Sequence, residues 1–205
     1  MIEQTMRNVC YIATLFLVLG CTKQSTETRY YPSKSSFPIE KIELVDLDTV
    51  QLNFKELTNK IARYYNEEKR LFVEFNDSTI KKQVIPYTYD GGLVKFKNVL
   101  RIKSDSILID NGYPISELKR ILKRHFENKG RVPHYSDAPE RALVEVTIDT
   151  SMNGKELKEV LIKITRAFDE INEETKDTLK LRVFFDYFRQ LPLPPPPPNM
   201  KSKYK

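Results

Sequence analysis

The feature that most constrains the fold is a long apolar stripe in the second half of the chain. Its members follow the i, i+3, i+4, i+7 spacing of a helix with one buried face. They are Leu157, Val160, Leu161, Ile164, Phe168 and Ile171. Most of the stability of such a helix comes from packing its apolar face against another layer. The chain therefore has to supply a sheet or further helices for this one to cover.

Strand patterns and a second amphipathic helix surround this stripe. The strand patterns are Val99–Ile102, Ile107–Ile109, Leu143–Ile148 and Leu179–Phe185. The apolar side of the second helix carries Leu118, Ile121, Leu122, His125 and Phe126. The order from Val99 onward is therefore β-β-α-β-α-β. Because each helix is apolar on one side only, we predict an α+β fold in which a small mixed sheet has both helices on one face.

A smaller β-α-β unit precedes this arrangement. Its strands are predicted at Ile39–Leu44 and Leu71–Phe75. The helix between them begins at Asn53, and Glu56 three residues later completes a capping-box spacing. The unit is similar in pattern to residues 100–146, which makes it a candidate half-repeat. An internal duplication and a chance similarity of two α/β units both explain this likeness.

The chain begins with the features of an export signal. Arg7 precedes an apolar run, Val9–Leu19, which at about a dozen residues is too short to cross a bilayer core of ~30 Å. The junction that follows, Val18–Cys21, resembles the lipobox of bacterial lipoproteins. That resemblance implies cleavage before Cys21 and attachment of lipid, such as palmitate, to this cysteine. An ordinary signal peptide and a marginal transmembrane anchor are the alternatives.

These patterns divide the chain into five parts. They are a signal peptide (1–20), a flexible tether (21–38), the smaller β-α-β unit (39–92), the larger α+β domain (97–188) and a polyproline and basic tail (189–205). The lipobox resemblance implies a lipid-anchored protein of the cell envelope that faces the periplasm. Thr22 stands where an aspartate retains some lipoproteins in the inner membrane, so we favour the outer membrane.

Charge and cysteine content narrow the function classes. The net charge is +6, but Lys and Glu alternate along the chain instead of clustering. Since an exported protein also does not meet nucleic acid, we predict no nucleic-acid partner. Removal of residues 1–20 takes Cys10 away and leaves Cys21 alone, so a disulfide within the mature chain is excluded. The fold has to depend on a packed core.

Four segments of the larger domain form a connected pattern. Ile107–Ile115 is a strand that leads into an Asn-Gly-x-Pro-Ile turn, and Ser116–Leu118 opens a helix. Val144–Asp149 is a strand, and Ile164–Ile171 belongs to the last helix. Together these segments resemble the periplasmic domain of the ExbD/TolR biopolymer-transport proteins over residues 97–188. The resemblance implies a small, often homodimeric α/β domain that works with an ExbB- or TonB-type component to pass energy to the outer membrane.

One departure from that family limits the expected function. Its members carry a transmembrane helix with a proton-handling aspartate, and a carboxylate in lipid persists only for a functional reason. Val9–Leu19 contains no acidic residue, so no position of this chain matches that aspartate. Proton-driven work by this chain alone is therefore not expected. The function that the resemblance still implies is that of a binding and dimerising domain, here tethered by lipid.

Few residues are candidates for chemistry. His134, Asp137 and Glu140 lie on one proline-bounded loop and suit either a metal or acid–base site of a hydrolase, or an ordinary polar loop. His125 lies at the edge of an apolar stripe and is predicted to pack. No serine has the Gly-x-Ser-x-Gly context of a nucleophile. We therefore predict no catalytic residues, no metal, no cofactor and no enzyme activity.

The C-terminal end holds the candidate partner-binding residues. Val183–Phe188 is apolar on both strand faces, so it is either covered twice or forms an interaction edge. Half of the twelve prolines fall between Pro192 and Pro198, which favours a stiff polyproline II rod. This tail is either a docking arm with a cationic tip for anionic lipid, or a segment without a partner. The candidates are Phe184, Phe185, Tyr187, Phe188, Pro194, Pro195, Pro196, Pro197, Pro198, Lys201, Lys203 and Lys205.

Together these observations predict a membrane-tethered periplasmic lipoprotein that acts as a non-enzymatic protein-binding module. A biopolymer-transport or energy-coupling complex of the envelope is the expected setting. Two alternatives stay open: a structural or peptidoglycan-associated envelope lipoprotein, and a hydrolase that uses His134, Asp137 and Glu140.

Overall fold

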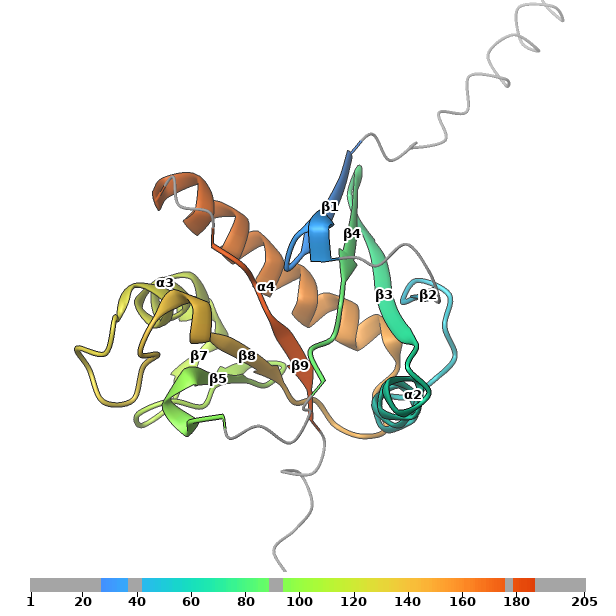
Figure 1. The fold of residues 1–205 in the computed structure, drawn as a ribbon, viewed down its shortest axis with the longest axis horizontal. Helices are drawn as coiled ribbons and strands as arrows, with labels where there is room; N and C mark the ends of the chain where they lie inside the picture. The colour runs from blue at the N-terminus through green and yellow to red at the C-terminus, as the bar shows by residue number, and fades with distance from the viewer. Residues whose placement is uncertain (1–26, 37–41, 89–93, 176–178, 187–205) are drawn as a thin grey trace, which may run out of the picture.

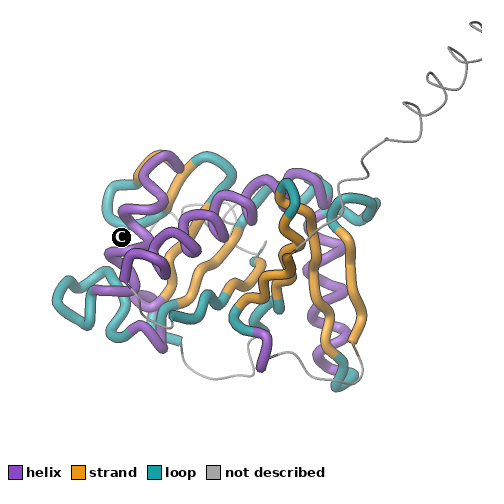
Figure 2. The backbone as a smooth tube through the Cα atoms, turned by 90° about the horizontal axis from the view of Figure 1, so that it is seen from above, coloured by secondary structure: helices purple, strands orange, loops and turns teal. Residues whose placement is uncertain are grey.

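The computed structural model describes residues 27–36, 42–88, 94–175 and 179–186. Within these ranges the chain forms two β-sheets and three α-helices, which confirms the predicted α+β class. The two sheets lie next to each other, and one long helix runs past both of them (Figure 1). Figure 2 shows the same arrangement from above, with the strands in two groups.

The first sheet has four strands in the order β1-β4-β3-β2. Its elements are β1 (Glu27–Tyr31), β2 (Ile42–Asp46), α2 (Phe54–Asn66), β3 (Arg70–Asp77) and β4 (Ile80–Val84). β2 and β3 are parallel and are joined by α2, as the predicted β-α-β unit requires. The predicted capping box is also present: the Asn53 side chain accepts from the Glu56 N–H, and the Glu56 carboxylate accepts from the Asn53 N–H, both at 2.9 Å.

Residues 27–36 correct the prediction of a flexible tether over residues 21–38. β1 pairs in parallel with β4 along its whole length, and Lys34–Ser36 forms a short 3-10 helix. The polar composition of this segment gave no strand signal, because strand side chains that point to solvent do not need to be apolar. One inward side chain anchors it. Tyr31 is 2% exposed and packs edge-on against Phe168, with 6.2 Å between ring centroids.

The second sheet has five strands in the order β7-β6-β5-β8-β9. Its elements are β5 (Val99–Ile102), β6 (Ser106–Ile107), β7 (Tyr113–Pro114), α3 (Leu118–Glu127), β8 (Leu143–Val146), α4 (Gly154–Thr175) and β9 (Val183–Phe185). The chain order confirms the predicted β-β-α-β-α-β pattern, with an extra short strand, β7, before α3. Short 3-10 helices occur at Phe96–Asn98, Ile115–Glu117 and Pro139–Arg141.

Both helices of the second half pack on one face of this sheet, as predicted. That face consists of alternate residues of the central strands, among them Leu100, Ile102, Val144 and Val146. α3 and α4 lie against each other over it (Figure 1). The opposite face carries a smaller cluster made by Val99, Leu143 and Phe184. The sheet is therefore covered mainly on one side and locally on the other.

One hydrophobic core extends across both sheets. α4 borders it from Leu157 to Ile171, which confirms the burial of the predicted stripe. The same core includes Phe75 of β3 and Phe54 of α2, and the Phe54 ring lies 6.0 Å from that of Phe185 in β9. The smaller and larger units predicted from the sequence therefore share one interior.

The starts of α2 and α4 meet where the two sheets join. Asn53 and Asn153 form an antiparallel bridge, and the first N–H of α2 donates to the Met152 carbonyl at 2.6 Å. The first N–H groups of a helix have no partner within that helix, so this bond satisfies one of them. Gly154 lets the start of α4 lie against the loop between β2 and α2, because a Cβ at that position would overlap the Val50 side chain.

Candidate functional site

A groove of about 440 Å³ lies between α2 and the end of β9. The second half of α2 forms one wall, and the chain that follows β4 forms the other together with β9. Aromatic and apolar side chains dominate the lining, and a few polar groups lie among them. Its residues include Ala62, Tyr65, Asn66, Tyr87, Phe185 and Asp186. Apolar walls with a few placed polar groups are typical of a binding surface.

β9 carries two of the predicted partner-binding residues and is covered on both faces. Phe185 is 8% exposed and lies in the main core, whereas Phe184 is 6% exposed on the opposite face. For this part of the segment, the predicted double covering is correct. Both rings are largely buried and both line the groove, and their predicted role as partner contacts stays a prediction.

β9 is also the edge strand of its sheet. On its outer side, Pro86 forms a parallel bridge with Val183, and the Tyr87 N–H donates to the Val183 carbonyl at 2.7 Å. In a strand, the backbone groups of every second residue point to the same side. The N–H and carbonyl of Phe185 therefore face the same side as those of Val183, so the groove is bordered by backbone as well as by side chains.

The remaining predicted site residues lie outside the described residues. They are Cys21, Tyr187, Phe188, Pro194, Pro195, Pro196, Pro197, Pro198, Lys201, Lys203 and Lys205. Their predicted roles in lipidation and partner binding stay predictions.

The structure does not bring together a catalytic or metal site from His134, Asp137 and Glu140. The Asp137 carboxylate pairs with Lys97 at 2.5 Å and with Lys95 at 3.5 Å, and the Lys97 ammonium group lowers the pKa of that carboxyl. His134 and Glu140 are exposed. In the described part of the chain, no group of three or more His, Cys, Asp or Glu side chains could hold a metal ion. The hydrolase alternative gains no support from this geometry.

His125 packs in the interior, as predicted. It is fully buried on α3, and its Nε2 lies 3.2 Å from the Asn98 carbonyl oxygen. Burial lowers the pKa of His125 to about 4, because a charged imidazolium is costly away from water. The Asn98 side chain also accepts from the Ser136 hydroxyl at 3.1 Å and from the Asp137 N–H at 2.9 Å. Asn98 thereby ties the neighbouring loop to the sheet.

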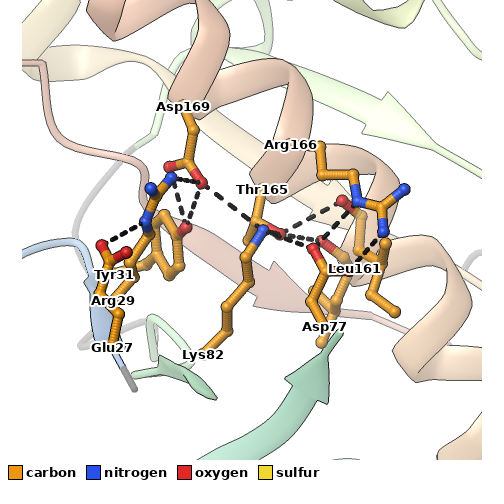
Figure 3. Close-up of polar contacts among 10 residues, drawn as sticks. Glu27, Arg29, Tyr31, Asp77, Lys82, Leu161, Thr165, Arg166 and Asp169 are labelled. Atoms are coloured by element: carbon orange, nitrogen blue, oxygen red, sulfur yellow. Dashed lines mark hydrogen bonds and ion pairs between the residues drawn. The ribbon is translucent and has the colours of Figure 1, made fainter. Parts of the chain in front are cut away.

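A cluster of charged side chains joins the first sheet to α4 (Figure 3). At its centre is Lys82 of β4, whose side chain is 1% exposed. Its Nζ lies 3.0 Å from Asp77 and 3.5 Å from Asp169, and it donates to the Thr165 hydroxyl at 2.9 Å. A buried ammonium group is costly unless it is paired and hydrogen-bonded, and here both conditions are met.

Each carboxylate of this charge cluster has a second cationic partner. Arg166 donates to both oxygens of Asp77, at 3.0 and 2.5 Å, and lowers the pKa of that carboxyl. Asp169 accepts from Arg29 and from the Tyr31 hydroxyl, each at 2.8 Å. Burial and the Asp169 charge raise the pKa of Tyr31, so its hydroxyl stays a donor. The cluster holds β1, β3, β4 and α4 together.

The charge cluster was not predicted from the sequence, although a signal for it was present. Ile80, Lys82 and Val84 alternate along β4, so Lys82 occupies a position that points to the core. A lysine at such a position requires a buried counter-ion. On α4, Thr165 and Asp169 are four residues apart, which places both on one side of the helix.

Comparisons of this chain with protein-family models, with curated proteins and with solved structures found no match. Among the described residues, no helix has the length and apolar character needed to cross a membrane. The function therefore has to be argued from the residues and their geometry.

Asp77→Asn should destabilise the protein more than Lys82→Met. Asp77→Asn leaves the buried Lys82 ammonium group with Asp169, at 3.5 Å, as its one remaining carboxylate among the described residues, so the loss approaches the about 3–5 kcal/mol typical of a broken buried pair. Lys82→Met removes the ammonium group, and each carboxylate keeps an arginine partner. The double variant should therefore be more stable than Asp77→Asn alone in urea unfolding followed by circular dichroism. Simple addition of the two single losses would contradict the coupling.

Acid should destabilise the protein through His125. Its pKa is 6.5 in an unfolded chain and about 4 in the folded one, so the unfolded state binds the proton first. The contribution of neutral His125 to the free energy of unfolding is fully present above pH 6.5. It falls as the pH approaches 4, by about 3 kcal/mol in total. His125→Gln should remove this slope from the free energy of unfolding, and the exposed His134→Gln should keep it. An unchanged slope in His125→Gln would show that other groups cause the loss.

Proposed function

We propose that this protein is a lipid-tethered envelope protein that faces the periplasm, binds another protein and catalyses no reaction. The tether is supported by the resemblance of Val18–Cys21 to a lipobox and by the short apolar run before it. β1 begins at Glu27, six positions after Cys21. At ~3.3–3.6 Å per residue, the folded domain starts within about 20 Å of the lipidated cysteine. The domain would therefore work close to the membrane surface.

The observation that carries the binding proposal is the groove between α2 and β9. Tyr65, Tyr87 and Phe185 supply aromatic surface, and the Asn66 amide and the tyrosine hydroxyls supply hydrogen-bond donors. Proline-rich segments suit such a surface, since they present ring faces and carbonyl acceptors but few N–H groups. We assign the groove to an extended, proline-containing segment of an envelope protein.

The setting follows from the resemblance of residues 97–188 to the ExbD/TolR periplasmic domain. It favours a biopolymer-transport or energy-coupling complex with an ExbB- or TonB-type component, and it favours homodimers. Without the membrane aspartate of that family, this chain would serve as an accessory binding subunit. Thr22 after the lipidated cysteine favours the outer membrane.

Replacement of the lipidated cysteine tests the tether. Cys21→Ala should abolish incorporation of labelled palmitate in cells and release the protein from the membrane fraction. Cys10→Ala should do neither, because Cys10 lies in the predicted signal peptide. Cross-linking in cells should recover an ExbB- or TonB-type component with the wild type and not with Cys21→Ala.

Two outcomes would contradict this function. Unchanged palmitate labelling of Cys21→Ala would contradict lipidation at Cys21. Catalytic turnover by the purified protein would contradict the proposal that it is not an enzyme. Recovery of cell wall alone in the cross-linking experiment would favour the structural alternative.

A further inference from the structure

The tail that follows β9 has the chemistry that the groove suits. Pro192 and Pro194–Pro198 lack backbone N–H donors, offer carbonyl acceptors and favour an extended polyproline II rod. Leu191 and Leu193 add apolar side chains to it. We propose that residues 191–198, the proline segment, bind in the groove between α2 and β9 of the same chain. The groove would then carry an internal ligand.

The groove offers aromatic surface to such a rod. Tyr65 lines it from α2, Tyr87 from the chain after β4, and Phe185 from β9. The Arg70 guanidinium carbon lies 5.1 Å from the centre of the Tyr65 ring and helps to hold that ring in place. Aromatic grooves bind proline-rich segments because the rod is already extended and loses little entropy on binding. The Asn66 amide adds a donor for a proline carbonyl.

Chain connectivity brings the proline segment close to the groove. Asp186 is the last described residue and lines the groove, and Pro192 follows six positions later. Six residues span at most ~20 Å, which leaves room for the chain to reverse its direction. A short linker gives an effective concentration in the mM range, so an affinity of about 1 mM already fills half the sites or more. A second copy has to compete with that concentration, which favours the same chain.

Charge adds to the match. Asp186 is the one charged side chain among the described residues that line the groove. Asn66 lies at the C-terminal end of α2, where helix carbonyls carry partial negative charge. The three lysines within residues 201–205 begin three positions after Pro198, so a bound proline segment would bring positive charge to this region.

This inference rests on the proposed function in one respect, namely that the groove is the binding surface. A filled groove makes the proline segment an internal competitor for the partner. Partner binding then requires displacement of the segment, so variants without the prolines would bind a partner more tightly.

A disulfide between the groove and the tail tests the proposal. The full mature chain, residues 21–205, contains no other cysteine once Cys21→Ser is made. Ala62→Cys and Asn199→Cys then supply a single pair, one exposed in the wall of the groove formed by α2 and one just after the prolines. We expect an intramolecular disulfide to form at least tenfold faster than in a chain with Pro194–Pro198 replaced by serine. That control keeps the length of the tail and removes the rod.

The rate is read on non-reducing gels, and mass spectrometry of the linked peptide identifies the product. As a second control, Thr79→Cys on the exposed β3–β4 turn should react slowly with Asn199→Cys. Equal rates with and without the prolines would overturn the proposal. A covalent dimer as the main product would also overturn it, since a second copy would then fill the groove. None of these results depends on lipid or on a partner, so failure here is distinct from failure of the proposed function.

Discussion

The attachment of α4 to the first sheet is the constraint on which the rest of the structure depends. The buried Lys82 ammonium group is tolerated only while Asp77 of β3 and Asp169 of α4 stay beside it. The same helix covers the second sheet with its apolar stripe. One helix thus fixes both sheets, with charged and apolar contacts to the first and apolar contacts to the second. α2 connects two strands of the first sheet, and β9 is a strand of the second. The groove between α2 and β9 therefore exists only while the two sheets keep their relative placement.

Elements with a local pattern were predicted from the sequence. The apolar spacing of α3 and α4 predicted both helices, and the α+β class followed from the strands around them. The capping box at Asn53 was predicted because it involves only Glu56, three residues away. β1 was not predicted, since its mostly polar residues are ordered by pairing with β4, far along the chain. Local polarity predicted a tether there, and tertiary pairing overrode it.

The candidate site was predictable only in part. Phe184 and Phe185 were identified from a strand that is apolar on both sides, but the wall from α2 depends on how the two sheets meet. One signal of that meeting was present in the sequence. The pattern Asn-x-Lys-Glu-Leu begins both α2 and α4, at residues 53–57 and 153–157, and these two helix starts contact each other. The half-repeat predicted from the sequence compared the smaller unit with residues 100–146 instead.

Photo-cross-linking in cells tests most directly whether the groove binds a partner. A photoreactive residue at Ala62, which is exposed and lines the groove, is compared with one at Thr79, on the β3–β4 turn outside it. The predicted result is an adduct with a defined envelope protein from position 62, absent from position 79 and lost with Cys21→Ala. The same adducts from both positions would contradict a binding site in the groove.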